Sequence, residues 1–333
     1  MKALLLKAPR QLEIADLPAA PLQAGQVRVR VRKVGVCGSD YSSVAGKLPF
    51  TRYPIVPGHE ACGDVMECSG DTPFRIGERV VIHPILGDRD DPVFARGDVH
   101  HCDSTEVLGV VSRNGAYAQE VVVEDYMLRP APAGVDDETA AMVEPVAVAV
   151  RALNRGALSR GERVLVLGAG NIGLLLIQAA RALGAGRVVV TDLAPSRLRL
   201  AETLGVDEAV DVRGGFPAER FEKSFDLVID GVGNEQTVAD AVVACRRGGR
   251  IVVYGVPPGE IRFPLKTAFA KDLTLATSRL YDADFSTALR LVSEGRIRTH
   301  PLITHRVALE DAPELIGRIL DGSEAAIKVM ITP

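Results

Sequence analysis

The chain has 333 residues, with 39 lysine and arginine residues against 43 aspartate and glutamate residues, so its formal net charge is −4. This length predicts about two domains, and the near-neutral charge provides no basic surface for nucleic acid or an anionic membrane. The five cysteines are too few for a disulfide framework, and neither a signal peptide nor a membrane span is apparent, so we expect a globular protein of the cytoplasm.

Three regions of the chain differ in their pattern. Residues 1–145 contain short β-like runs separated by glycine and proline, such as 26–31 and 79–82, which is typical of an irregular, mostly antiparallel β domain. Residues 146–280 alternate apolar strands with helical periodicity, which predicts a parallel, doubly wound sheet. Residues 281–333 return to a mixed pattern. We therefore predict an α/β domain inserted into a β domain.

The elements of the last two regions follow from their periodicity. The central region predicts strands at 163–167, 187–192, 225–230 and 250–255, and helices at 172–183, 196–204 and 236–245. The C-terminal region predicts a helix at 285–293 and strands at 303–307 and 327–331.

A glycine motif directly follows the first strand of the central region. Gly168, Gly170 and Gly173 form a Gly-x-Gly-x-x-Gly pattern, with Asn171 and Ile172 between the last two, where a helix is predicted to begin. Such glycines permit a tight turn, close approach of the backbone to a pyrophosphate and close helix–strand packing. The pyrophosphate then lies on free N–H groups of the helix N-terminus. In this context the motif predicts a dinucleotide site, with an ordinary strand–helix turn as the alternative.

The cofactor is predicted from the end of the next strand. Asp192 lies 24 positions after Gly168, where a carboxylate can accept hydrogen bonds from the adenosine ribose. Because a carboxylate there repels a 2′-phosphate, we expect NAD rather than NADP. Arg197 leaves NADP open, since arginine can bind a phosphate. The alternative role for Asp192 is to cap the helix predicted at 196–204.

Residues of metal-ligand type occur in three short motifs. Cys37 lies in Val-Cys-Gly-Ser-Asp, His59 and Glu60 in Pro-Gly-His-Glu, and Glu144 in Glu-Pro-Val-Ala-Val-Ala. Taken singly, such a cysteine is usually a small buried hydrophobic residue and Gly-His-Glu is only a loop. Taken together with the glycine motif, they resemble the zinc-dependent medium-chain dehydrogenase/reductase family of alcohol and polyol dehydrogenases, over essentially the whole chain.

The resemblance implies a fold and a domain division. It implies an α/β protein with a GroES-like, β-rich catalytic domain formed by residues 1–145 and 281–333. A Rossmann NAD-binding domain with a doubly wound parallel sheet, residues 146–280, is inserted into it. Relatives commonly pair through their nucleotide domains, so a homodimer or homotetramer is expected.

The resemblance also implies one catalytic zinc, held by Cys37, His59 and Glu60. Glu144 stands where alcohol dehydrogenases have a further sulfur ligand, and in the sorbitol dehydrogenase branch this glutamate either binds the zinc or holds its water. Three protein ligands and one exchangeable position are what a catalytic zinc requires. A secondary alcohol would bind there and give its hydride to the nicotinamide.

The resemblance also implies roles in the reaction for two residues close to Cys37 in the sequence. Asp40 would fix the ring of His59, and Ser39 would take the proton of the alcohol. Many relatives have a histidine five residues after the ligand cysteine, whereas this chain has Ser42, preceded by Tyr41. We therefore expect the proton to leave through water, the cofactor ribose or another group.

A loop ending at Cys102 resembles the lobe on which relatives often carry a structural zinc, with the spacing Cys-x2-Cys-x2-Cys-x7-Cys. Counted back from Cys102, this spacing falls on Asp88, Asp91 and Phe94. Two hard oxygen ligands and a phenylalanine cannot complete a site of four thiolates. We therefore expect no structural zinc and one metal ion per chain.

Histidines near this loop could form a different site with Cys102, although their spacing matches no known pattern. The simpler alternative is that they are surface residues of a metal-free loop. The histidines in question are His83, His100 and His101. The other three cysteines, expected to be buried hydrophobic residues, are Cys62, Cys68 and Cys245.

The substrate class is predicted from two segments that resemble L-idonate and L-galactonate 5-dehydrogenases, residues 46–54 and 277–280. Arg279 lies about where sorbitol-type relatives place an arginine on the substrate hydroxyls, and it could pair with a sugar-acid carboxylate or form a surface ion pair. Lys328 lies where relatives place a basic residue against the cofactor pyrophosphate, with an exposed lysine as the alternative. Val256 is expected to border the nicotinamide.

The main hypothesis is therefore a zinc- and NAD-dependent dehydrogenase that oxidises a secondary hydroxyl of a polyol or sugar acid. L-Threonine and butanediol dehydrogenases share the ligand pattern and are alternatives. A zinc-free quinone or enoyl reductase is a different chemistry on the same fold, and a non-catalytic binding protein is a third class. Fold alone does not choose among them.

Overall fold

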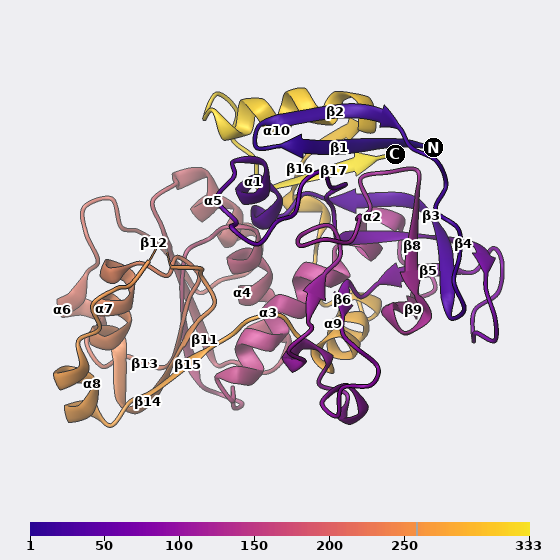
Figure 1. The fold of residues 1–333 in the computed structure, drawn as a ribbon. Helices are drawn as coiled ribbons and strands as arrows, with labels where there is room; N and C mark the ends of the chain where they lie inside the picture. The colour runs from indigo at the N-terminus through magenta and orange to yellow at the C-terminus, as the bar shows by residue number, and fades with distance from the viewer. Residues whose placement is uncertain (258) are drawn as a thin grey trace. The chain divides into compact units, whose positions relative to one another are not determined.

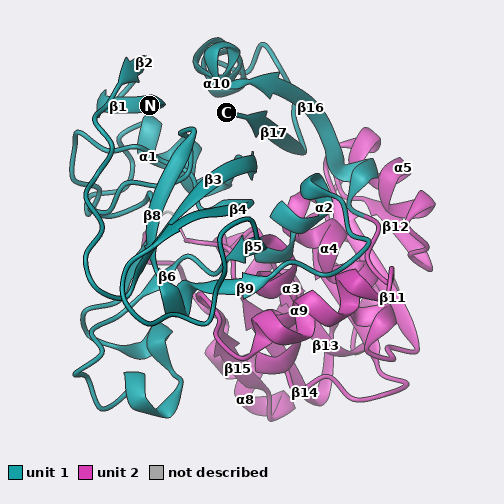
Figure 2. Ribbon diagram, turned by 90° about the vertical axis from the view of Figure 1, so that its right-hand side faces the viewer, with its two compact units in different colours: residues 1–144, 299–333 teal, residues 145–298 magenta. Residues whose placement is uncertain are grey.

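The computed structural model describes residues 1–257 and 259–333. It divides into two compact units (Figure 2): unit 1 is Met1–Glu144 with Thr299–Pro333, and unit 2 is Pro145–Arg298. The chain thus enters unit 1, forms unit 2, and returns to unit 1, which is the insertion expected from the sequence.

The position of residues 281–298 differs from the prediction, which placed them in the first domain. The structure groups them with unit 2. Their helix carries the buried Asp284, whose carboxylate accepts a hydrogen bond from Asn154 and pairs with Arg151, both also in unit 2. A buried carboxylate requires such partners, so this helix is tied to unit 2.

Unit 1 is built on a seven-stranded sheet in the order β16, β17, β3, β4, β5, β9, with β8 also paired to β3 (Figure 1). The pair β16–β17 is parallel and the other pairs are antiparallel. In β3 the buried residues Val27, Val29 and Val31 alternate with more exposed ones, as expected for a strand with one face on the core. The strands are β3 (Gln26–Gly35), β4 (Glu60–Cys68), β5 (Arg79–Ile82), β8 (Glu120–Glu124), β9 (Leu128–Pro130), β16 (Ile303–Ala308) and β17 (Lys328–Thr332).

Smaller elements complete unit 1. Two antiparallel pairs are β1 (Lys2–Ala8) with β2 (Gln11–Asp16), and β6 (Ile85–Leu86) with β7 (Glu106–Val107). The α-helices are α1 (Gly38–Val44), α2 (Asp137–Ala141) and α10 (Ala312–Leu320), and the 3₁₀ turns are η1 (Phe94–Arg96), η2 (Val99–His101), η3 (Asp125–Met127), η4 (His300–Leu302) and η5 (Leu309–Asp311).

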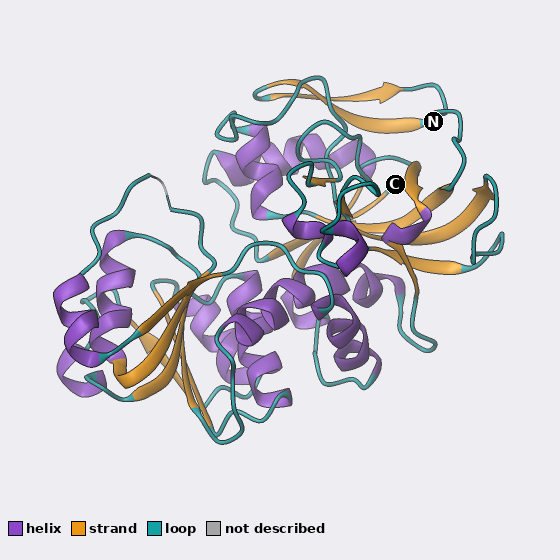
Figure 3. Cartoon of the chain, turned by 60° about the horizontal axis from the view of Figure 1, so that its bottom comes forward, coloured by secondary structure: helices purple, strands orange, loops and turns teal. Residues whose placement is uncertain are grey.

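Unit 2 contains a six-stranded parallel sheet in the order β12, β11, β10, β13, β14, β15, with helices on both faces (Figure 3). In chain order within the unit this is 3-2-1-4-5-6, the arrangement of a dinucleotide-binding doubly wound sheet. The predicted α/β fold class is therefore confirmed. The strands are β10 (Arg163–Leu167), β11 (Arg187–Asp192), β12 (Glu208–Asp211), β13 (Phe225–Asp230), β14 (Cys245–Val253) and β15 (Thr274–Thr277).

Three helices were predicted within residues 146–280, and each of them begins and ends within one residue of its predicted bounds. Those not predicted are short or lie at the unit boundary. The helices are α3 (Val143–Arg155), which crosses that boundary, α4 (Asn171–Ala182), α5 (Pro195–Thr203), α6 (Ala218–Phe221), α7 (Glu235–Ala244), α8 (Leu265–Lys271) and α9 (Asp284–Ser293). Within the described part of the chain, none is both long and apolar enough to span a membrane.

Candidate metal centre and cofactor site

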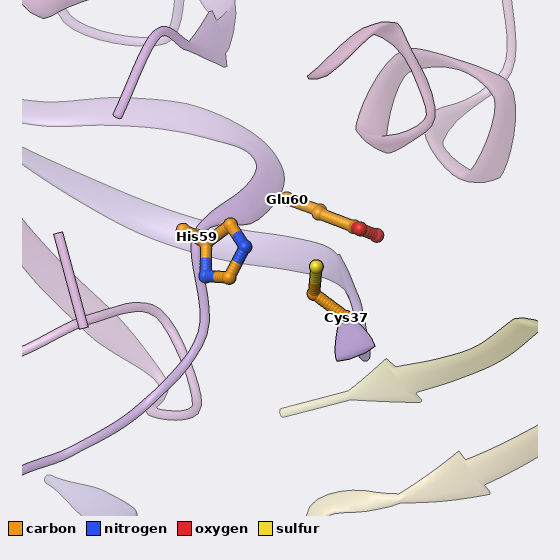
Figure 4. Close-up of side chains that lie close together, drawn as sticks. All are labelled: Cys37, His59 and Glu60. Atoms are coloured by element: carbon orange, nitrogen blue, oxygen red, sulfur yellow. The ribbon is translucent and has the colours of Figure 1, made fainter. Parts of the chain in front are cut away.

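Three of the predicted metal ligands come together in unit 1 (Figure 4). One ligand atom from each of Cys37, His59 and Glu60 lies within 4.8 Å of the other two. Cys37 follows β3 and precedes α1, while Glu60 is the first residue of β4, opposite Gly35 of β3. The antiparallel register of β3 and β4 therefore brings together residues that are far apart in the sequence.

A carboxylate supports the imidazole from behind. Asp40 Oδ2 accepts hydrogen bonds from the Cys37 backbone N–H at 2.8 Å and from the Tyr117 hydroxyl at 2.6 Å, and Asp40 Oδ1 lies 3.6 Å from His59 Nδ1. On the other side of the ring, His59 Nε2 lies 3.5 Å from Ser39 Oγ. Asp40 thus lies where the resemblance implied, on the ring nitrogen away from Ser39.

The electrostatics of this cluster favour a cation. Burial alone lowers the pKa of His59, but the charges of Asp40 and Cys37 outweigh burial and raise that pKa well above its usual value. Burial raises the pKa of Asp40. Sulfur, imidazole and carboxylate in one largely buried cluster are the donors that zinc prefers. The residues present therefore fit a zinc ion.

Lys328 lies in the same cluster. Its ammonium donates to Glu60 Oε2 at 2.5 Å and to the Val36 carbonyl at 2.9 Å, and Lys328 and Glu60 are only 2% and 1% exposed. The alternative of an exposed lysine is wrong. The structure gives Lys328 partners that the sequence did not predict, and its contact with the cofactor pyrophosphate stays a prediction.

Glu144 is buried in the first turn of α3 and is not one of the three residues whose ligand atoms lie within 4.8 Å. Its charge contributes to raising the pKa of both His59 and Lys328, which places its carboxylate near the cluster. Ser42, by contrast, turns its hydroxyl onto its own helix and donates to the Gly38 carbonyl at 3.1 Å.

The glycine motif forms the turn between β10 and α4. At Gly173 any side chain would overlap the carbonyl oxygen of Gly168, so the helix packs against the turn as the motif requires. The residue that caps α4 is Gly170, which offers no side chain to the helix N–H groups, and Asn171 and Ile172 form its first turn. These N–H groups suit a phosphate.

Asp192 organises this turn. One carboxylate oxygen accepts a hydrogen bond from the Ala169 backbone N–H at 2.7 Å, and the other accepts one from Ala194 at 2.8 Å. Arg197 lies 3.7 Å from the same carboxylate. The cap residue of α5 is Ala194, so the alternative that Asp192 caps this helix is wrong. Its hydrogen bonds to the adenosine ribose stay a prediction.

The remaining predicted residues of unit 2 are surface residues. Arg279 is exposed, in the segment after β15, and Val256 is 86% exposed after β14. Both are accessible to a ligand, but nothing in unit 2 tests the roles predicted for them.

The loop that ends at Cys102 uses its acidic residues in its own turns. Asp88 accepts from the Asp90 backbone N–H at 2.9 Å and Asp91 accepts from that of Val93 at 2.8 Å. Phe94 packs edge to face against Tyr126, with ring centroids 4.9 Å apart. Burial and the neighbouring Asp91 raise the pKa of the Cys102 thiol. Hydrogen bonds and aromatic packing therefore hold this loop.

The histidines of the loop differ from the surface histidines suggested as the simpler alternative. His83 and His100 are buried, and burial lowers the pKa of His83 to about 3. His101 is exposed, and its ring lies with Asp98 and His100 in a second group whose ligand atoms are within 4.8 Å of one another. Cys102 is not part of that group.

Two contacts of the site were missed at the sequence level. Tyr117, which bonds Asp40, lies 77 residues from it in the chain and is not part of any motif recognised in the sequence. The contact of Lys328 with Glu60 was also not predicted, because it spans 268 positions. Such contacts depend on sheet register, which local motifs do not encode.

Comparison with known proteins agrees with this fold. Residues 23–133 match the family model of the alcohol dehydrogenase GroES-like domain, and residues 171–294 match that of the zinc-binding dehydrogenase. The chain is 30% identical to L-galactonate-5-dehydrogenase of Escherichia coli K12, over 100% of this chain and 99% of the relative. It is 26% identical to a sorbitol dehydrogenase of Bacillus subtilis, over 100% and 97%.

A solved structure agrees over the full length. The NADH complex of the alcohol dehydrogenase RspB from Escherichia coli CFT073 matches with a TM-score of 0.93 at 28% identity, covering 100% of this chain and 99% of that one. The chain therefore belongs to the zinc-type alcohol dehydrogenase family, whose two domain types it contains, and is a dehydrogenase acting on alcohols.

Proposed function

We propose that the protein is a zinc- and NAD-dependent dehydrogenase that oxidises a secondary hydroxyl of a polyol or sugar acid. The observation that carries this proposal is the cluster of the partly buried Cys37 with the buried His59 and Glu60, with Asp40 behind the imidazole. The names of the relatives, L-galactonate-5-dehydrogenase and sorbitol dehydrogenase, support the substrate class.

In this proposal, Cys37, His59 and Glu60 hold the zinc, and Glu144 either binds it or holds its water. When bound, zinc supplies a Lewis acid that acidifies the substrate hydroxyl, and NAD supplies the hydride acceptor. Ser39, on the Nε2 side of His59, accepts the hydroxyl proton. Because the Ser42 hydroxyl is occupied by Gly38, the proton leaves through water or the cofactor ribose.

The cofactor is held by unit 2. The N–H groups at the start of α4 bind the pyrophosphate, and the Asp192 carboxylate accepts from the ribose hydroxyls, which excludes a 2′-phosphate. Arg279 pairs with the carboxylate of a sugar acid, Val256 borders the nicotinamide and Lys328 contributes positive charge toward the pyrophosphate. Arg197 is already 3.7 Å from Asp192, which supports a role in charge balance rather than in binding a 2′-phosphate.

We also propose one zinc per chain and a homo-oligomer. Asp88 and Asp91 are used in turns of their loop, which supports the absence of a structural zinc there. The parallel sheet of unit 2 has β15 as one of its edge strands, and the exposed apolar side chains of Leu275, Leu265 and Phe269 support pairing with a second copy.

The deciding experiment is an initial-rate screen of polyols, aldonates, L-threonine and vicinal diols with NAD and with NADP, combined with elemental analysis of protein purified without chelators. We expect turnover of polyols or aldonates with NAD and about one zinc per chain. Activity confined to L-threonine or to diols would replace the substrate class. Full activity without zinc would replace the mechanism by that of a zinc-free reductase.

A further inference from the structure

Tyr117 occupies a position next to the metal cluster that the proposed mechanism does not use. It lies in unit 1 just before β8, and its side chain is 1% exposed. Its hydroxyl donates to Asp40 Oδ2 at 2.6 Å and lies 3.4 Å from the Gly35 carbonyl. The same carboxylate lies 3.6 Å from His59 Nδ1 through its other oxygen. Tyrosine, carboxylate and imidazole therefore form one buried chain.

Backbone contacts fix Tyr117 on the segment that carries His59. The Tyr117 backbone N–H donates to the Pro57 carbonyl at 2.9 Å, and the N–H of Ala116 donates to the Gly58 carbonyl at 2.8 Å. Gly58 has φ +98°, and a side chain there would overlap the Tyr117 ring. The glycine that precedes His59 is therefore needed both for its backbone conformation and to seat this ring.

The hydroxyl of Tyr117, and not only its ring, contributes to the site, because it is a hydrogen-bond donor to Asp40. Without it, Asp40 Oδ2 would keep a single donor, the Cys37 backbone N–H at 2.8 Å. A buried carboxylate with fewer donors is held less firmly. Groups that orient the ring of a metal-binding histidine commonly contribute roughly 10- to 100-fold in metal affinity or activity.

We propose that Tyr117 is a positioning residue: its hydroxyl holds the Asp40 carboxylate against His59 Nδ1, so that the other ring nitrogen is presented to the metal. This inference rests on the proposed function, because it requires that Cys37, His59 and Glu60 hold zinc. Tyr117 acts through Asp40 and touches neither the substrate nor the metal.

The test is the zinc affinity of Tyr117→Phe, which keeps the ring and removes only the hydroxyl. Zinc dissociation constants are measured by competition with a chromophoric chelator, without any activity assay. The control is Tyr53→Phe, because the Tyr53 hydroxyl makes a similar 2.7 Å bond to the Ser43 carbonyl in the same unit but does not bond Asp40. We expect Tyr117→Phe to raise the dissociation constant about tenfold, and Tyr53→Phe to leave it unchanged.

A double-mutant cycle separates positioning from simple structural support. Because Tyr117 acts through Asp40, adding Tyr117→Phe to Asp40→Asn should cause little further loss of zinc affinity. Excess zinc should restore much of the activity of Tyr117→Phe. Should Tyr117→Phe fail to fold, weakened zinc binding by folded Asp40→Asn supports the same link from the other end.

The outcomes distinguish this inference from the proposed function. If the wild-type protein binds no zinc, or if Cys37→Ala binds it equally well, the proposed function fails. If the wild-type protein binds zinc and Tyr117→Phe binds it equally tightly, or if both tyrosine variants weaken binding equally, the positioning role of Tyr117 is wrong.

Discussion

At the scale of single residues, the site is distinguished by a buried ion pair. Lys328 and Glu60 form an ion pair that is almost inaccessible to solvent, next to Cys37. Such pairs contribute little net stability compared with apolar residues, but removing one partner leaves a buried charge uncompensated. This pair therefore fixes the Glu60 carboxylate in a known place, which suits a residue proposed to hold a metal.

Replacing Lys328 by methionine tests whether its ion pair with Glu60 stabilises the fold or whether the lysine serves mainly in binding the cofactor pyrophosphate. The ion pair predicts that Lys328→Met lowers the free energy of unfolding by about 3 kcal/mol, because the Glu60 carboxylate loses its counter-charge. The measurement is urea unfolding of metal-free protein, alongside the KM for NAD. The control is Lys7→Met, which removes an exposed lysine from a surface ion pair with Glu13. A higher KM for NAD with unchanged stability would instead support the pyrophosphate contact alone.

His83 predicts a pH dependence of stability. Burial lowers its pKa to about 3, whereas the pKa of an unfolded histidine is about 6.5. The unfolded chain therefore binds one more proton than the folded chain between these values, so His83 makes stability fall as the pH falls from about 6.5 toward 3. We expect His83→Gln to flatten the dependence of the unfolding free energy on pH between about pH 6 and 4. An unchanged slope would mean that His83 titrates normally.

At the scale of elements, the sequence predicted the four inner strands of the parallel sheet in unit 2 and missed its two edge strands. The apolar run of β10, Arg163–Leu167, is unbroken and flanked by the glycine motif, and its bounds agree with the prediction. Both edge strands of the same sheet, β12 (Glu208–Asp211) and β15 (Thr274–Thr277), are only four residues long and partly exposed, so they lack that signal. Edge strands depend on their neighbour rather than on their own composition.

We expect the exposed edge strand β15 to form the contact between two copies of the chain. We expect Leu275→Lys to shift the protein from oligomer toward monomer, with a dissociation constant about 100-fold higher, because two-fold pairing would bring the new charges of two copies close together. Sedimentation equilibrium measures the change. Ile76→Lys is the matched control, since Ile76 is also an exposed apolar residue but lies in unit 1. Identical masses for both variants and the wild type would exclude this edge as the interface.

At the scale of the whole molecule, the sequence predicted the two domain types and the three residues that come together in unit 1, because each of these is encoded locally. Cys37, His59 and Glu60 lie in recognisable motifs, and Gly168 and Gly173 lie in a strand–helix turn. The supporting contacts of Tyr117 and Lys328 could not be predicted, because they depend on how distant strands pair. The end of the inserted domain was likewise missed, since Asp284 is tied to unit 2 by partners about 130 residues earlier.

The two units should respond separately to their ligands. A ligand that binds only the folded state stabilises it in proportion to the logarithm of its concentration over its dissociation constant. A chelator should therefore lower the melting temperature of the wild type but not that of Cys37→Ala, and NAD should raise the melting temperature of the wild type but not that of Asp192→Ala. Differential scanning calorimetry measures both shifts. A chelator effect that persists in Cys37→Ala would place a metal elsewhere, with Asp98, His100 and His101 as the group to mutate next.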